Sequence, residues 1–404
     1  MSHLLRMILP LLVLLLSVTG LFLSSWIVIP APNMTLIVLG VGAPEVSNWL
    51  MVLNAVAILL AIVVMRGSKL KGAKRYSRIA VAASLLALFL SSLPALQLSS
   101  TEQRLNRAMS NALGSDYSVN LPNNGLLPMR DRPFVLADAF RGINPGESRY
   151  TSGIRFAQPD GVPLSMDIYR PPQVGKYPAL VVIYGGSWRS GTPTQNSDFS
   201  RYMAARGYTV FAIDYRHAPL HRFPAHLDDV RTALAFIRQH ATEYEADIER
   251  MALLGRSAGG HLAMLAAYQP DAMPVRAVVS YYGPVDLAGG YASPPRPDPI
   301  DTRAVLRAFL GGTPDQLPQQ YSLASPINYV KPQLPPTLLI HGSRDNLVQF
   351  KFIQQMHERL RAVGNTAVLL EIPWAEHAFD AVFQGFSNQL ALYYTERFLA
   401  WALR

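Results

Sequence analysis

The chain contains no cysteine among its 404 residues. This excludes disulfides, a thiol nucleophile and thiolate metal ligands, and it suits an oxidising compartment outside the cytoplasm. Acidic residues are also few, with 27 Asp and Glu against 36 Lys and Arg, and residues 1–98 hold a single acid, Glu45. Residues 1–98 have a net charge of +6, which leaves only +3 for the rest of the chain. Because the basic excess is confined to one region and no aromatic–basic pattern accompanies it, we expect no nucleic acid partner.

Long apolar runs fill the first 98 residues. They cover residues 7–29, 46–65 and 79–98, and each is about 20 residues long, enough to cross a bilayer as a helix. Trp26 and Trp49 lie near the ends of these runs, where amphipathic rings favour the membrane interface. We therefore predict a transmembrane region of about three helices. The alternatives are a cleaved signal peptide for the first run and buried core helices for the others.

The charges between the runs predict an orientation. The loop between the first two runs holds Glu45 and no basic residue. The loop between the second and third runs holds six cations and no acid: Arg66, Lys69, Lys71, Lys74, Arg75 and Arg78. By the positive-inside rule this basic loop lies in the cytoplasm, with the N-terminus. The third helix then delivers the rest of the chain to the outer, periplasmic or extracytoplasmic, side of the membrane, and membrane lipids are expected partners.

Two further regions follow the apolar runs. Residues 99–149 are mixed in composition and are predicted to be a linker or a cap, although residues 101–113 have helical spacing. From residue 150 to 404 short apolar runs alternate with amphipathic segments. This alternation is typical of an α/β domain with a mostly parallel sheet covered by helices on both faces.

One short motif in the third region indicates chemistry. Gly255-Arg256-Ser257-Ala258-Gly259 stands between an apolar run of strand type, 251–254, and a small-residue segment of helical type, 260–267. A G-x-S-x-G motif between strand and helix is the context of a nucleophile elbow, in which a sharp turn exposes the serine hydroxyl. Residues without bulk are needed beside the serine because the backbone bends so tightly there.

Several other segments, together with this one, carry a resemblance to a family. Residues from about 150 to the end resemble an α/β-hydrolase, in the esterase/lipase branch related to hormone-sensitive lipase and the short carboxylesterases. The matching segments are Ile183-Tyr184-Gly185-Gly186-Ser187-Trp188, Asp214-Tyr215-Arg216-His217-Ala218-Pro219, the elbow with Gly260-His261, Tyr282-Gly283-Pro284-Val285-Asp286, Ile340-His341-Gly342-Ser343-Arg344-Asp345 and Glu376-His377-Ala378-Phe379.

The resemblance implies a catalytic triad in the chain order serine, acid, histidine. Ser257 would be the nucleophile, His377 the base and Asp345 the acid that orients the imidazole. Asp286 is the alternative acid, whereas Glu376 is poorly placed to orient the ring of its neighbour. His217, His221 and His226 fall in a turn and are not spaced for one helical face, so neither a metal nor an organic cofactor is expected. Asp214 is expected to be structural, bonding the turn at Arg216.

The resemblance also implies an oxyanion hole. One donor would be the amide of Ala258, and the others would come from Gly185, Gly186 and Ser187. Relatives usually carry His-Gly-Gly-Gly or His-Gly-Gly-Ala in this loop, where this chain has Tyr184 and Ser187 at the first and fourth positions. The backbone amides survive both changes. We expect the support beneath the loop to differ, with the Tyr184 hydroxyl as a candidate replacement.

A long insertion follows Asp286 and runs to residue 331, with a predicted helix around residues 302–310. Insertions of this kind form lids or acyl pockets, so Leu306, Phe309 and Leu310 either line a pocket or anchor the loop. Overall we expect a membrane-anchored serine hydrolase of small-molecule or lipid carboxylic esters. The alternatives are an amidase, formamidase or serine peptidase, an acyltransferase, and a non-catalytic adhesion or sensor protein.

Overall fold

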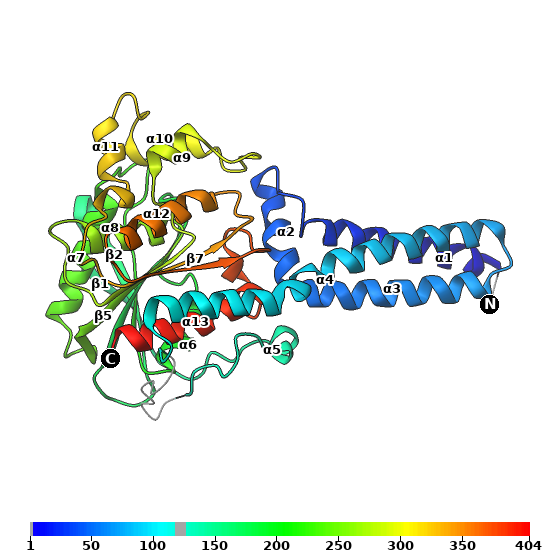
Figure 1. The fold of residues 1–404 in the computed structure, drawn as a ribbon, viewed down its shortest axis with the longest axis horizontal. Coiled ribbons are helices and arrows are strands. Elements are labelled where there is room, and N and C mark those ends of the chain that lie inside the picture. Colours follow the sequence, from blue (N-terminus) through cyan, green and yellow to red (C-terminus); the bar gives the residue numbers. More distant parts are fainter. Residues whose placement is uncertain (1–2, 118–126) are drawn as a thin grey trace.

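A computed structural model describes residues 3–117 and 127–404 of the chain. Its N-terminal part is a bundle of α1 (His3–Ser25), α3 (Ser47–Gly67) and α4 (Lys71–Leu113), which projects from one side of a sheet domain (Figure 1). These three helices are long and apolar enough to cross a membrane, as the sequence predicts. A fourth helix that the sequence analysis did not anticipate, α2 (Met34–Glu45), lies where the bundle meets the sheet domain (Figure 1).

Small residues form the interior of the bundle. The buried positions of α4 recur every three or four residues and are Ala73, Ser77, Ala80, Ser84, Ala87 and Ser91. Small side chains let membrane helices approach closely, because packing rather than burial from water drives their association. Leu59 and Val63 point outward instead, with 63% and 67% of their surface exposed. The outward residues are thus those suited to contact hydrocarbon.

Residues 99–113 differ from the predicted linker or cap. They continue α4 beyond the third apolar run as one 43-residue helix. In this extension Leu105, Met109 and Leu113 are buried against the sheet domain, in a cluster that includes α13 (Phe386–Ala402). The extension is therefore part of the packed domain, and the remainder of the predicted linker holds α5 (Leu136–Arg141), while residues 118–126 lie outside the described residues.

The sheet has eight strands in the order β1-β2-β4-β3-β5-β6-β7-β8. Its first two pairings, β1 with β2 and β2 with β4, are antiparallel, and every other pairing is parallel. This confirms the predicted α/β class with a mostly parallel sheet. The strands are β1 (Arg149–Ala157), β2 (Leu164–Arg170), β3 (Tyr177–Ile183), β4 (Thr209–Ile213), β5 (Ala246–Arg256), β6 (Ala277–Tyr281), β7 (Thr337–Gly342) and β8 (Ala367–Ile372).

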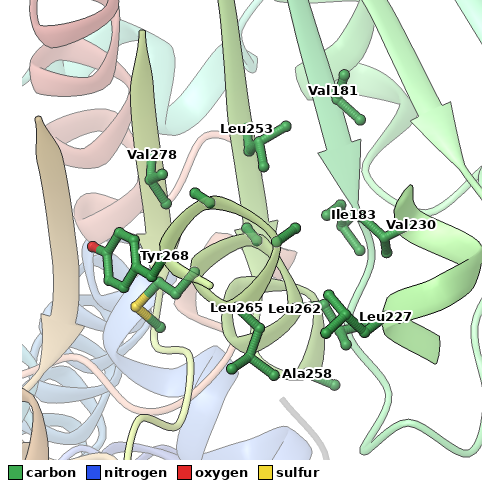
Figure 2. Close-up of a cluster of buried hydrophobic side chains, with 14 of the residues drawn as sticks. Val181, Ile183, Leu227, Val230, Leu253, Ala258, Leu262, Leu265, Tyr268 and Val278 are labelled. Atoms are coloured by element: carbon green, nitrogen blue, oxygen red, sulfur yellow. The ribbon is translucent and has the colours of Figure 1, made fainter. Parts of the chain in front are cut away.

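Helices cover both faces of the sheet. One face packs against α7 (Ala225–Gln239), α8 (Ala258–Tyr268) and α12 (Phe350–Ala362), and the other against α6 (Ser197–Ala204), α13 and the end of α4. Successive residues of a strand point to opposite faces of the sheet. Because helices cover both faces, the residues on each face must be apolar, and β3 is buried throughout its length. Figure 2 shows the first face, where Val181, Leu253 and Val278 of the strands meet Leu262 and Leu265 of α8.

The insertion after Asp286 forms three helices beside the carboxyl ends of the strands. They are α9 (Leu287–Ala292), α10 (Thr302–Leu310) and α11 (Pro318–Leu323), followed by a 3₁₀ turn, Pro326–Tyr329. The bounds of α10 match the predicted helix. Asp301 caps it by accepting a hydrogen bond from the amide of Ala304 at 3.1 Å, which satisfies one of the free donors of the first turn.

Candidate active site

Ser257 lies on a strained turn between β5 and α8. Its backbone angles, φ of +52° and ψ of −121°, are values that residues other than glycine rarely adopt. A Cβ on Gly255 would clash with the backbone of Gly259, and a Cβ on Gly259 would clash with the carbonyl of Ile183. Both glycines are therefore required by the space around the turn. The turn matches the nucleophile elbow expected from the motif.

The two partners proposed for Ser257 lie beside it. His377 follows β8, Asp345 follows β7, and both residues are only 5% exposed. The Nε2 atom of His377 is 2.9 Å from Ser257 Oγ, and its Nδ1 atom is 2.8 Å from Asp345 Oδ2. Since an ionised carboxylate only accepts hydrogen bonds, Nδ1 carries the proton and Nε2 is free to accept one from the serine hydroxyl. The arrangement is a continuous chain of hydrogen bonds from acid to nucleophile.

Asp345 and His377 stabilise each other's charged forms. Burial by itself would raise the pKa of Asp345, but the neighbouring His377 and His341 outweigh burial, so the net shift of that pKa is downward. Burial by itself would lower the pKa of His377, but the charge of Asp345 and its hydrogen bond shift that pKa upward overall. Asp345 also accepts from the amides of Leu347 and Val348, both at 2.8 Å. The carboxylate is thus held ionised and fixed in orientation.

The alternative acids have other partners. Asp286 accepts a hydrogen bond from the amide of Gly289 at 2.8 Å and so caps α9. Glu376 accepts from the side chain of Asn346 at 3.0 Å, and from that residue's amide. Burial and the nearby Asp345 raise the pKa of Glu376 to about 7. Asp345 is therefore the acid whose carboxylate meets His377 Nδ1.

The predicted oxyanion loop lies next to Ser257. A Cβ on Gly185 would lie 2.8 Å from the carbonyl oxygen of Arg256 and 3.0 Å from the Cβ of Ser257. Gly186 has a φ of +132°, and Ser187 has a φ of +54°. Ser187, Ser257 and Ala258 line one cavity, and Ala258 is the first residue of α8, where the backbone amide has no partner within the helix. Of the four residues proposed for the hole, Ser187 and Ala258 thus line the cavity, and Gly185 lies against Ser257.

Tyr184 takes part in the support beneath this loop. Its hydroxyl donates to Asp214, lies 2.9 Å from Nε2 of His217, and its ring stacks on Tyr215 with 4.4 Å between the ring centres. Asp214 thus has structural partners, and it also accepts from the amide of Tyr215 at 2.9 Å, in the turn before Arg216. The Arg216 side chain itself pairs with Asp229 of α7 at 2.8 Å.

A second support was not found by sequence reasoning. The indole of Trp188 donates to His261 Nδ1 at 3.2 Å, and its ring stacks on Phe309 of α10 with 4.1 Å between the ring centres. The Nε2 atom of His226 lies 3.2 Å from the carbonyl oxygen of Trp188. Burial lowers the pKa of His226 to about 3 and that of His261 to about 4, so both rings are neutral at physiological pH. Because Phe309 is fully buried and stacks on Trp188, it anchors the insertion to the sheet domain.

The cavity beside Ser257 is mainly apolar and has a volume of about 650 Å³ including its open mouth. Leu306, on α10, lies in the wall of this cavity, whereas Phe309 of the same helix anchors the insertion. The two roles expected for these residues, lining a pocket and anchoring the loop, are therefore both found on α10. A carboxylic ester has an uncharged acyl part, which such a wall accommodates. Besides Trp188 and Ala258, the apolar lining comprises Pro284, Val285, Leu287, Pro295, Ile300, Val305, Leu306, Leu347, Val348 and Phe352.

Several of the relatives found by comparison with known proteins are esterases. The family model BD-FAE matches residues 166–360. Esterase LipC of Mycobacterium tuberculosis is 36% identical over 246 residues, and the match covers 57% of this chain and 61% of LipC. Esterase LipQ of the same organism is 31% identical over 306 residues, and the match covers 69% of this chain and 70% of LipQ.

A solved structure agrees with these relatives. Thermogutta terrifontis esterase 2 phosphonylated by sarin has 27% sequence identity and a TM-score of 0.51, and the match covers 63% of this chain and 91% of that one. The chain spans less than two thirds of the length of two of the relatives. It covers 61% of LipC and 57% of the probable carboxylic ester hydrolase LipM, also of Mycobacterium tuberculosis. With its mostly parallel sheet, its elbow and these relatives, the chain belongs to the esterase/lipase branch of the α/β-hydrolase superfamily.

Proposed function

We propose that this chain is a membrane-anchored serine hydrolase that cleaves carboxylic esters through an acyl-Ser257 intermediate. The observation that carries the proposal is the hydrogen-bonded chain Asp345–His377–Ser257 at the end of an apolar cavity. The named esterases among the relatives support the same reaction class.

The mechanism follows from the positions of the three side chains. Ser257 Oγ attacks the ester carbonyl carbon while its proton passes to His377 Nε2, giving a tetrahedral oxyanion. The amide of Ala258 and those of the loop 185–187 are the proposed donors to that oxyanion. The intermediate collapses as His377 returns the proton to the leaving alkoxide, which departs as the alcohol. Water then attacks the acyl-enzyme with the same base, and the acid product and free Ser257 are released.

Hydrolysis of p-nitrophenyl esters tests this proposal. We expect the full chain, purified in detergent, to hydrolyse short and medium acyl esters, and Ser257→Ala to reduce turnover by about 10⁴-fold or more. A Ser115→Ala variant, which changes an exposed serine just after α4 and outside the site, serves as the matched control. Turnover by Ser257→Ala at the wild-type rate would contradict the proposed nucleophile.

We also propose that the N-terminus is cytoplasmic and that the catalytic domain lies on the outer side of the membrane. The start of α1 and the basic turn between α3 and α4 lie together at the end of the bundle far from the sheet (Figure 1). This supports opposite sides of the membrane for the basic turn and the catalytic domain. Alkaline phosphatase fused after Arg404 should be active, since that reporter works only outside the cytoplasm. Activity of a cytoplasmic reporter alone at this position would contradict the orientation.

A further inference from the structure

The membrane region (residues 1–98, the anchor) makes specific contacts with the loops that hold Asp345 and His377. The carboxyl ends of the strands face the bundle, and α2 lies between the two (Figure 1). Two segments at this edge are touched by the anchor: the loop after β7, which holds Asp345, and the segment from 373 to 387, which holds His377 and enters α13. The contacts are polar and directional, which a flexible tether would not need.

The first contact involves Arg344, the residue before Asp345. Its guanidinium donates to the carbonyl oxygen of Val28, in the connection between α1 and α2. Its backbone amide donates to the carbonyl oxygen of Ala375 at 3.2 Å, two residues before His377. Burial lowers the pKa of Arg344, although Glu376 opposes the shift. Arg344 therefore joins the anchor to the Asp345 loop and the His377 loop at once.

The second contact involves Glu45, the last residue of α2. Only 2% of Glu45 is exposed, and its carboxyl group accepts from the amide of Ser387 at 2.8 Å and from the Ser387 hydroxyl at 2.5 Å. Ser387 lies in the first turn of α13, whose N-cap is Gly385. A glycine has no side chain to cap that turn, and Glu45 takes this role from 342 residues away.

The space around Gly385 shows that this arrangement depends on glycine. A Cβ at Gly385 would clash with Glu45 Oε2 and would lie 2.9 Å from Glu45 Cβ. The first turn of a helix also has backbone amides without partners inside the helix, and Glu45 accepts from one of them. The position of Glu45 is thus explained by α13 rather than by α2.

Ser387 passes this contact on to the histidine loop. Its hydroxyl oxygen accepts from the indole nitrogen of Trp374 at 3.0 Å. Trp374 is 2% exposed and stands three residues before His377. The chain of contacts therefore runs from α2 through Ser387 and Trp374 to the start of the loop that holds the base.

We infer that two contacts of the membrane region, at Val28 and at Glu45, are a structural part of the active site, and that Glu45 is a positioning residue for His377. This inference rests on the proposed hydrolase function. On this account the membrane region does more than retain the enzyme at the membrane, because it fixes the two loops that must hold His377 in line with Ser257. A misplacement of about 1 Å at a reacting group lowers a rate by as much as about 100-fold.

Full-length variants in detergent test the inference. Burial raises the pKa of Glu45 to about 8, against the opposing effect of the Ser387 hydrogen bonds, which favours a neutral carboxyl near pH 7. Glu45→Gln is then a close mimic and should keep kcat within about threefold of wild type. Glu45→Ala should lower kcat on p-nitrophenyl butyrate by about tenfold or more, per site titrated with a fluorophosphonate, with KM within about twofold. Val38→Ala, on the exposed face of α2, is the matched control and should leave kcat unchanged.

The outcomes separate a positioning role from a purely structural one. A Glu45→Ala protein with a lower Tm but wild-type kcat per titrated site would overturn the inference. If Glu45→Ala does not fold, Ser387→Ala replaces it, since that variant removes the acceptor of Trp374 and keeps the main-chain bond to Glu45. An unchanged kcat in Ser387→Ala would then overturn the inference. Failure of the wild type to hydrolyse any ester would instead refute the proposed function.

Discussion

Arg256 and Asp380 form an ion pair in which the two side chains are only 4% and 3% exposed. Arg256 immediately precedes Ser257, and Asp380 follows His377 by three residues. Asp380 also accepts a hydrogen bond from the hydroxyl of Tyr282, whose ring centre lies 4.5 Å from that of His377. The pair therefore connects the strand that leads to the nucleophile with the loop that carries the base.

Breaking this pair should destabilise the domain. Asp380→Ala leaves the Arg256 charge buried without its partner, and such changes cost about 3–5 kcal/mol of unfolding free energy. Asp271→Ala is the matched control, because Asp271 pairs with Arg231 but keeps 69% of its side chain exposed, and exposed pairs contribute less than about 1 kcal/mol. Denaturant unfolding in detergent measures both. Equal losses from the two variants would contradict the structural role given to Asp380.

The pH dependence of turnover should follow His377. The base must be neutral to accept the serine proton, and Asp345 shifts the pKa of His377 upward from 6.5. We therefore expect kcat/KM to fall with decreasing pH through an apparent pKa above 6.5. In Asp345→Asn the raising charge is lost while burial remains, so the acid limb should move to lower pH and kcat should fall by about 10⁴-fold. An unchanged acid limb in Asp345→Asn would show that another group titrates.

The active-site elements were predictable from sequence because their signals are local. A strand, a glycine-bounded serine and a small-residue helix are consecutive in the chain. Asp345 and His377 were instead assigned from the family resemblance, with which their positions after predicted strands agree. The parallel sheet was likewise visible in the unbroken apolar run of β3. Each of these depends on residues within a few positions of one another.

The contacts that support the site were not predictable in this way. Arg216 pairs with Asp229, which lies 13 positions further along the chain on α7, and no local pattern marks that acid as its partner. The contact between Glu45 and Ser387 joins residues 342 positions apart, and no periodicity encodes such a pairing. The helical spacing of residues 101–113 was visible, but the change from apolar to mixed composition at residue 99 hid the fact that they continue the preceding helix and pack on the sheet domain.

Gly186 should be essential to the oxyanion loop. A Cβ at this position, which has a φ of +132°, would clash with the carbonyl oxygen of Ser190. Gly186→Ala should therefore displace the loop amides and lower kcat by about 10²–10³-fold, as loss of an oxyanion donor does. Gly72→Ala is the control, since a Cβ there meets no atom within 4 Å. Wild-type kcat in Gly186→Ala would place the oxyanion donors elsewhere.

The cavity wall at Leu306 should set the acyl preference. Leu306 is 4% exposed and borders the cavity that reaches Ser257. Leu306→Phe fills part of that space, so kcat/KM for p-nitrophenyl hexanoate should fall by about tenfold relative to the acetate, in line with the discrimination an apolar pocket achieves. Leu323→Phe on α11, where the side chain is 51% exposed, should leave the ratio unchanged. The same ratio in both variants would mean that the acyl chain binds elsewhere.

Labelling with a fluorophosphonate probe tests the central claim most directly, because the probe forms a covalent bond only with an activated serine. The wild-type chain in detergent should label at one site, and peptide mapping by mass spectrometry should place the adduct on Ser257. Ser257→Ala should not label, while Ser115→Ala, with its change at an exposed position outside the site, should label as wild type does. An adduct on another serine, or an unlabelled wild-type protein that is folded, would contradict the assignment of Ser257 as the nucleophile.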